Sequence, residues 1–222
     1  NTLYTIAQFY PRMAVYSDYQ GWQHKQFLGQ GEFTLPFGDF TVSITVPSDH
    51  IVASTGSLQN PTAVLSSSQR KRYAEARRSF DQPVIVASQE EAESREQGRS
   101  TSTATGTFKA ENVRDFAFAS SRKFIWDAQA VNIGGKVVMA ESFYPKEGNP
   151  LWEQYSTRIV AHTLKVYSKY TTDYTYPRAI SVHAKSIGME YPMICFNGGR
   201  PDADGTYSEG TKHGMLSVII HE

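Results

Sequence analysis

Two short stretches of this 222-residue sequence carry residue types that could do chemistry. The first is the pair His221-Glu222, which follows the apolar run SVII. At the end of a helix such a pair is the first half of the zinc-binding pattern His-Glu-x-x-His, in which imidazoles hold the metal and the carboxylate is a general base. The second histidine would follow one helical turn later, beyond the last residue given. Taken alone, the pair is a weak signal, because two polar residues at this place are usually just solvated.

The second stretch is Gly188-Met189-Glu190, between the strand-like runs RAISVHA (178–184) and YPMICFNG (191–198). A carboxylate at this place could bind an ammonium group, because charge-assisted hydrogen bonds are short and strong. A glycine lets the backbone of an extended peptide approach closely. The simpler interpretation of Glu190 is an exposed carboxylate at the end of a strand.

In this order and at this separation, the two stretches together resemble the aminopeptidase N family of zinc metallopeptidases (gluzincins). In that family an exopeptidase motif, Gly-x-Met-Glu, precedes His-Glu-x-x-His. The resemblance covers essentially the whole chain and is closest to a bacterial branch of the family. It extends to the segments AQFYPRMAVYSD (7–18), WQHKQFLGQGEFTLPFGDFTVSITVP (22–47), VRDFAFASSRKF (113–124) and YTYPRAISV (174–182).

The resemblance implies a hydrolase that removes the amino-terminal residue of peptides with one Zn²⁺ ion. His221 would be a metal ligand, and Glu222 would take the proton of the zinc-activated water. Gly188, Met189 and Glu190 would bind the substrate, with Glu190 holding its free α-ammonium. The second histidine, the third ligand glutamate and the transition-state tyrosine of the family are missing. We therefore expect a fragment that ends inside the zinc motif, binds zinc poorly and is inactive by itself.

One position departs from the family, and two other functions stay open. Many relatives have Gln-Phe-Glu where this chain has Gln8-Phe9-Tyr10, and a tyrosine carries no charge at neutral pH. The alternatives are a non-catalytic β-sandwich interaction module derived from the same family, and a bifunctional relative that also opens epoxides with the same zinc apparatus. The bacterial branch favours an exported or periplasmic protein.

Composition argues against several other partners. Lys and Arg together number 22, as do Asp and Glu, so a net charge of zero gives no support for binding nucleic acid or an anionic membrane. The basic cluster at 70–78 is surrounded by acidic residues. No apolar run approaches the roughly 18 residues of a transmembrane helix. The single cysteine, Cys195, excludes an internal disulfide and lies in an apolar run typical of a buried structural thiol. The other histidines show no ligand spacing and are expected to be structural or exposed: His24, His50, His162, His183 and His213.

Periodicity predicts a mainly β fold with an α/β part. Apolar residues alternate from Phe40 to Val46, and a second strand is expected at 50–56. A partial, antiparallel, sandwich-like amino-terminal β-domain is predicted for 1–120, and 121–222 would open a thermolysin-like catalytic domain. Between these parts we expect a short helix within 65–81, a strand at 83–88 and an exposed or mobile segment at 88–104. Strands are expected at 105–121 and as a pair around the turn 132–135. A helix is expected at 150–170, capped by Asn149 with Pro150 as its first residue, and a short final helix ends near His221.

Overall fold

The computed structural model describes residues 2–26, 34–185 and 187–222 of the chain. Two antiparallel three-stranded sheets form the first part, in the orders β1-β9-β5 and β4-β8-β6. Their strands are Tyr4–Ile6 (β1), Gly38–Pro47 (β4), Ile51–Ser54 (β5), Ser57–Leu58 (β6), Thr103–Val113 (β8) and Phe118–Ser121 (β9). Side chains of both sheets share one apolar cluster, so the sandwich-like amino-terminal part predicted from the sequence is confirmed.

Strand β4 follows the predicted alternation. Phe40, Val42 and Ile44 point toward the cluster, whereas the residues between them are exposed. In the antiparallel register with β8, Val42 lies opposite Phe108. Alternation with period two therefore places one face of β4 in the core, as pleated strands require.

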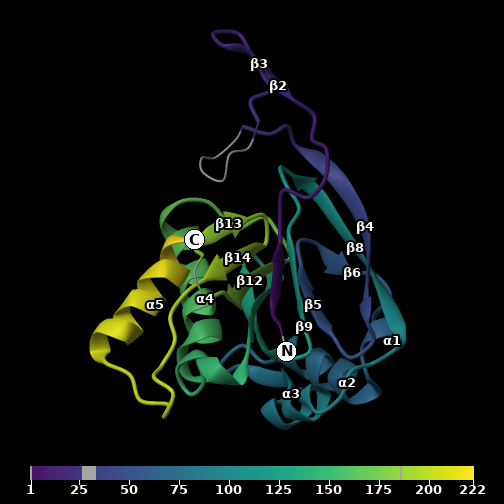
Figure 1. The fold of residues 1–222 in the computed structure, drawn as a ribbon. Helices are drawn as coiled ribbons and strands as arrows, with labels where there is room; N and C mark the ends of the chain where they lie inside the picture. The colour runs from purple at the N-terminus through teal and green to yellow at the C-terminus, as the bar shows by residue number, and fades with distance from the viewer. Residues whose placement is uncertain (1, 27–33, 186) are drawn as a thin grey trace.

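A larger mixed sheet of six strands, in the order β13-β14-β12-β11-β10-β7, occupies the middle of the molecule (Figure 1). The pairs β11–β12 and β12–β14 are parallel, and the other pairs are antiparallel. Gly134 and Gly135, both with positive φ, form the predicted turn between β10 and β11. The strands are Val84–Ala87 (β7), Ile125–Ile133 (β10), Lys136–Tyr144 (β11), Arg178–His183 (β12), Met189–Tyr191 (β13) and Ile194–Asn197 (β14).

Helices cover both faces of this sheet (Figure 1). One face packs on α4 (Leu151–Tyr170), α5 (Glu209–His221) and α3 (Gln89–Glu96). The other face packs on β5, β9 and α2 (Ser67–Ala76). The remaining helical segments are α1 (Pro61–Val64) and the 3₁₀ turn η1 (Lys146–Gly148).

Helix α4 confirms the predicted apolar stripe, with Trp152, Val160 and Leu164 buried on one side. Its start differs by one residue from the prediction. Pro150 is the cap and Leu151 the first helical residue, while Asn149 Oδ1 accepts only a long bond of 3.4 Å from the Glu153 N–H. The apolar stripe predicts that this segment is helical. It does not show at which residue the helix begins, because that depends on the 3₁₀ turn before it.

Two other expectations from the sequence are wrong. Only the second half of the expected exposed segment at 88–104 is exposed, at 97–99 and 101–103. Residues 89–96 form α3, which Ser88 and Glu91 begin with a capping box and Ala92 anchors in the core. The expected strand at 105–121 is two strands, because the chain leaves β8 after Val113 and enters another sheet as β9. Alternation by itself does not show where a chain changes sheets.

A two-stranded arm, β2 (Val15–Ser17) and β3 (Gly21–Gln23), projects from the body at the top of Figure 1. The rings of Tyr16 and Trp22 pack edge to face, and both side chains are largely exposed. Part of the segment 22–47 that carries the family resemblance, residues 27–33, lies outside the described residues.

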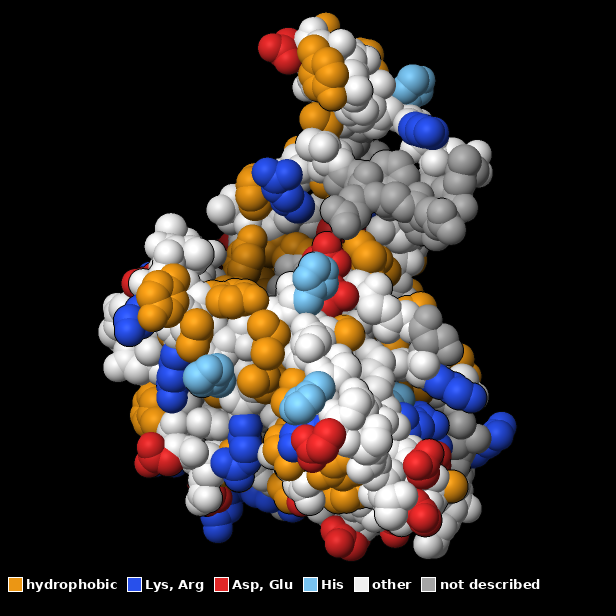
Figure 2. Space-filling model, turned by 90° about the vertical axis from the view of Figure 1, so that its left-hand side faces the viewer, with side chains coloured by type: hydrophobic (Ala, Val, Ile, Leu, Met, Phe, Trp, Pro, Cys, Tyr) orange, Lys and Arg blue, Asp and Glu red, His pale blue; other side chains and the backbone are white. Residues whose placement is uncertain are grey.

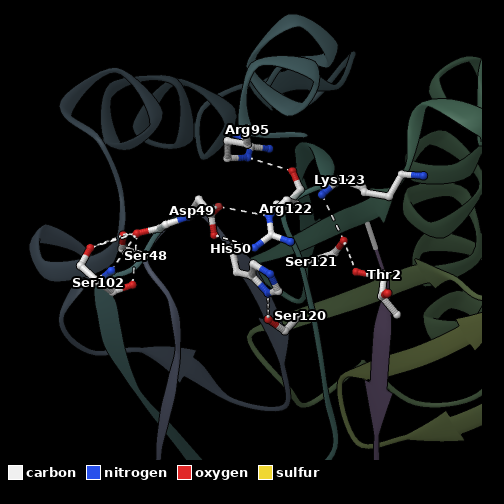
Figure 3. A network of polar contacts seen from close by, with 11 residues as sticks. Thr2, Ser48, Asp49, His50, Arg95, Ser102, Ser120, Ser121, Arg122 and Lys123 are labelled. Carbon is white, nitrogen blue, oxygen red and sulfur yellow. Dashed lines mark hydrogen bonds and ion pairs between the residues drawn. The ribbon is translucent and has the colours of Figure 1, made fainter. Parts of the chain in front are cut away.

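A polar network ties together three loops at the end of the molecule opposite the arm (Figure 3). Arg122 pairs with Asp49 at 3.1 Å, and Arg95 donates to the carbonyls of Arg122 and Phe124. Desolvation raises the pKa of Asp49, but the hydrogen bonds from Arg122 and the Ser100 N–H outweigh it and hold the pKa below its usual value. His50 accepts from or donates to Ser120 at 2.8 Å. These contacts hold together loops that connect strands of different sheets.

Within the residues described, no helix is both long enough and apolar enough to cross a membrane.

Candidate functional site

The edge strand β13 and the end of helix α5 bring the two predicted stretches together. A Cβ added to Gly188 would lie 3.1 Å from Glu222 Oε1. Glu190 is paired across the strands with Cys195, whose Sγ lies 3.5 Å from the carbonyl oxygen of Glu222. Gly188, Glu190 and Glu222 therefore lie close together, although the strand and the helix end are far apart in the sequence.

A pocket of about 460 Å³ opens beside this contact and is lined by both Glu190 and Glu222. Its floor is the helix-covered face of β12 and β14, and its walls are α4, α5 and the loop at 171–176. Asp173 is a third acidic lining residue, and no Lys, Arg or His is among the described residues that line the pocket. Figure 2 shows acidic and histidine side chains side by side at the edge of a hollow with hydrophobic walls.

Cys195 lies on the floor of the pocket. Burial raises the pKa of its thiol to about 12, and the nearby carboxylates of Glu222 and Glu190 add to the rise. The thiol therefore stays protonated at neutral pH, when only a thiolate would be a good nucleophile. This agrees with the structural role predicted for Cys195.

Met189 and His221 are placed differently from their neighbours in the motifs. Met189 lies on the opposite face of β13 and packs against the core cluster beneath the sheet. His221 is the last residue of α5 and is exposed. The structure thus brings three of the five predicted site residues together around the pocket and leaves these two at its margins.

The segment Gln8-Phe9-Tyr10 reaches the same region from the amino-terminal sheet. Gln8 Nε2 lies 3.5 Å from the hydroxyl of Tyr191, the residue after Glu190. Tyr10 turns away and donates to Asp115 Oδ1 at 2.5 Å, and burial together with this bond raises the pKa of Tyr10. Asp115 also pairs with Arg12 at 3.0 Å. The carboxylate nearest to Tyr10 is therefore already engaged within the β-domain.

Sequence reasoning missed most of the pocket wall. Asp173, Tyr174 and Tyr176 lie in the loop that leads into β12, and they were not predicted as site residues. The only signal in the sequence is the polar and aromatic stretch TTDYTY, which also suits an ordinary surface loop. The position of this loop depends on the packing of α4 against the sheet.

The residues present do not make a zinc site. Among those described, no group of three or more His, Cys, Asp or Glu side chains is placed to hold a metal ion. Structural and catalytic zinc sites use three or four protein ligands, and His221 stands alone. The buried His183 packs edge to face on Trp152 at 5.0 Å, and burial and Arg200 lower its pKa to about 4. Its position in the core suits the structural role predicted for it.

Neither a protein-family model nor a curated protein sequence matches this chain. Solved structures do match. An M1 zinc metallopeptidase from Deinococcus radiodurans shares 14% identity and a TM-score of 0.50, over 84% of this chain and 33% of its own. Aminopeptidase A of Legionella pneumophila, solved with aspartic acid, shares 9% identity and a TM-score of 0.52, over 84% of this chain and 19% of its own. This chain thus spans about a third and a fifth of those proteins, and the likeness shows that it has the fold of part of an M1 zinc metallopeptidase.

Proposed function

We propose that this chain is the part of a zinc-dependent aminopeptidase that recognises the free amino terminus of a peptide. The observation that carries the proposal is that Gly188 lies beside Glu222 at the edge of an acidic pocket. This places the edge strand β13 next to the end of α5, although the two elements are far apart in the sequence. The parent protein would hydrolyse the first peptide bond of its substrates.

Each residue has a distinct task in this proposal. The carboxylate of Glu190 accepts hydrogen bonds from the α-ammonium of the substrate, which restricts cleavage to the first residue. An extended peptide can lie along β13, because β13 is the edge strand of its sheet. Glu222 stands next to Gly188 and would act as general base toward the attacking water. His221 is the only zinc ligand proposed within the described residues, so the others would come from outside them.

Replacement of Glu190 by glutamine tests the role of its charge. We expect this chain to bind phenylalanine amide at least tenfold more tightly than its N-acetylated form, because the loss of a charged hydrogen bond costs about 1.5–3 kcal/mol. Glu190→Gln should remove most of that difference. Isothermal titration at neutral pH measures both affinities.

Glu209→Gln is the matched control, since Glu209 is an exposed carboxylate at the start of α5 and pairs with Lys212. It should keep the preference for the free amine. Equal binding of free and acetylated amides by the unmodified chain would contradict the proposed function.

Replacement of Gly188 by alanine tests the contact between the two motifs. The new Cβ would lie 3.1 Å from Glu222 Oε1, which is closer than ordinary contact, so the carboxylate must move by a few tenths of an ångström. We expect severalfold weaker binding of the amide with an unchanged or slightly higher melting temperature, because alanine restricts the unfolded chain. Gly198→Ala is the control, since its Cβ would meet only Ala184 O at 3.9 Å. The same loss of binding in both variants would argue against the contact.

A non-catalytic interaction module remains the second candidate, and the aromatic arm favours it. Met13, Tyr16, Tyr19 and Trp22 are between 62% and 82% exposed, and exposed apolar surface of this kind commonly marks a binding site. Hydrolysis of aminoacyl-anilides by the full-length, zinc-loaded parent would decide between the two. Activity that Glu222→Gln abolishes supports the enzyme, and inactive parent protein supports the module.

A further inference from the structure

We propose that the free edge of strand β4 is an interface at which a second copy of this chain pairs its own β4, antiparallel and about a two-fold axis. The pairing would join the β4-β8-β6 sheets of the two copies into one continuous sheet. The inference is independent of the proposed function, because β4 and β13 belong to different sheets and lie toward opposite sides of the molecule in Figure 1.

Strand β4 has a hydrogen-bonded neighbour on one side only. In the order β4-β8-β6 it is an outer strand, and β8 is the only strand that pairs with it among the described residues. At ten residues β4 is also the longest outer strand described, since the others have between two and four residues. Alternate residues of an outer strand direct their N–H and C=O groups away from the neighbouring strand. The free edge of β4 is therefore a long row of backbone groups that can pair with another strand.

Features that usually protect an outer strand are found only at the two ends of β4. Such features are charged side chains, proline and bulges. Asp39 and a shift of register lie near the start of β4, and Pro47 is its last residue. The segment between them, Phe40 to Val46, contains no charged residue, no proline and no glycine. High β-propensity and low charge over six or seven residues are typical of segments that associate by strand pairing.

The core-facing side of β4 is incompletely covered. Phe40, Val42 and Val46 pack against the apolar cluster of the amino-terminal sheets, but all three remain partly exposed. Only Ile44, at 6% exposed, is buried. A strand added at the free edge would remove more of this apolar row from water, which is favourable. The added strand must therefore present apolar side chains on the same face.

The opposite face of β4 carries hydroxyl groups. Thr41, Ser43 and Thr45 are exposed there. The Oγ1 atoms of Thr45 and Thr105 lie 2.9 Å apart across the pair with β8. A hydroxyl group can both donate and accept a hydrogen bond, so this row can interact with a second row of hydroxyls. The added strand must therefore be uncharged and must alternate apolar residues with hydroxyl-bearing ones.

Strand β4 itself meets these requirements. In an antiparallel pair centred on Ser43, Val42 of one copy lies opposite Ile44 of the other, and Thr41 lies opposite Thr45. Residues two positions apart share a face, so in this register apolar residues meet apolar residues and hydroxyls meet hydroxyls. No charge lies at the centre of either strand, so the pairing buries no unpaired charge. Because the same surface is used by both copies, the assembly closes as a dimer.

The test is the mass of this chain in solution as a function of its concentration, measured by sedimentation equilibrium. We expect the mass to rise from that of a monomer to that of a dimer and to level off there. The double variant Thr41→Lys/Thr45→Lys should weaken dimerisation about tenfold, because it places like charges opposite each other at two places. Thr41→Lys/Thr45→Glu places opposite charges there and should keep the dimer. A chain that stays monomeric at every concentration would overturn the proposal.

Thr103→Lys/Thr105→Lys is the matched control. It adds the same charge at two exposed positions of β8, which lies between β4 and β6 in the sheet. This variant should keep the dimer. Equal weakening by both lysine pairs would show that net charge, and not the pairing of β4, governs association, and it would overturn the proposal. Assemblies that grow beyond the dimer would contradict the two-fold pairing. If the variants of β4 do not fold, as judged by circular dichroism, the mass of the unmodified chain still decides.

Discussion

Glu141→Gln is expected to lower the free energy of unfolding by about 3–5 kcal/mol, because it leaves a buried arginine without its counter-ion. Glu141 lies on β11 and is fully buried. Its carboxylate accepts from Arg178 Nη2 at 2.6 Å, from Trp126 Nε1 at 3.0 Å and from the Tyr73 hydroxyl at 3.1 Å. An amide keeps the shape but not the charge, and its NH₂ group would face donors.

The same residues connect the parts of the fold. Arg178 on β12 also donates from Nη1 to the carbonyl of Gly56 at 3.1 Å, in the amino-terminal part of the chain. Tyr73 belongs to α2, so the Glu141–Arg178 pair connects the central sheet with a helix and with the turn between β5 and β6. We therefore expect the loss of stability to be global, not local.

Denaturant unfolding followed by tryptophan fluorescence measures this loss. Glu153→Gln is the control, because Glu153 is exposed on α4 and its replacement should change stability by less than about 0.5 kcal/mol. Glu141→Leu combined with Arg178→Met should recover much of the stability, because it removes both buried charges. A loss below about 1 kcal/mol for Glu141→Gln would show that the pair is not critical.

Although the lowered pKa of the buried His183 adds stability over the same range, the contribution of Asp127 to stability is expected to fall as the pH rises from about 4 to about 7. Burial raises the pKa of this carboxyl to about 7, although hydrogen bonds from Thr157 and Tyr144 oppose the rise. The folded state therefore holds a proton that the unfolded state loses near pH 3.9. The stabilisation is complete below that pH and is lost as the pH rises through 7. The difference is of the order of 4 kcal/mol.

Asp127→Asn should remove this contribution, so that the stability of the variant rises relative to that of the unmodified chain between pH 4 and 7. An amide does not titrate, and its NH₂ group can donate to the Thr157 hydroxyl, which can in turn donate to Ser142. We expect the variant to be more stable than the unmodified chain at pH 8 and no more stable at pH 4. Melting temperatures between pH 4 and 8 measure both profiles. Asp81→Asn, at an exposed position, should keep the original slope, and an unchanged slope in Asp127→Asn would contradict the assignment.

Much of the secondary structure follows from local patterns. The alternation from Phe40 to Val46 predicts β4, and the three- and four-residue spacing from Trp152 to Leu164 predicts α4, because each pattern buries one face of a regular element. The turn at Gly134-Gly135 needs residues that tolerate positive φ, and glycine supplies this. These features depend on residues that are close in the sequence, so they can be predicted without knowing the tertiary structure.

The site could be predicted only in part. Residue types and order single out Glu190 and the pair His221-Glu222, and the likeness to M1 metallopeptidases agrees at the level of the fold. The sequence does not show that Met189 faces the core, or that Asp173 and Tyr174 line the pocket. Those facts depend on the pleat of β13 and on the course of a loop.

The sequence by itself determined most of the element types, the neutral charge balance and the candidate residues of the two motifs. Only the tertiary structure decided that Gly188 lies beside Glu222, that Glu141 is fully buried beside Arg178, and that an acidic, apolar-walled pocket adjoins Glu190 and Glu222. The physical reason is that local patterns specify which face of an element is buried. The partners of that face are set by strand register and helix packing between segments far apart in the chain.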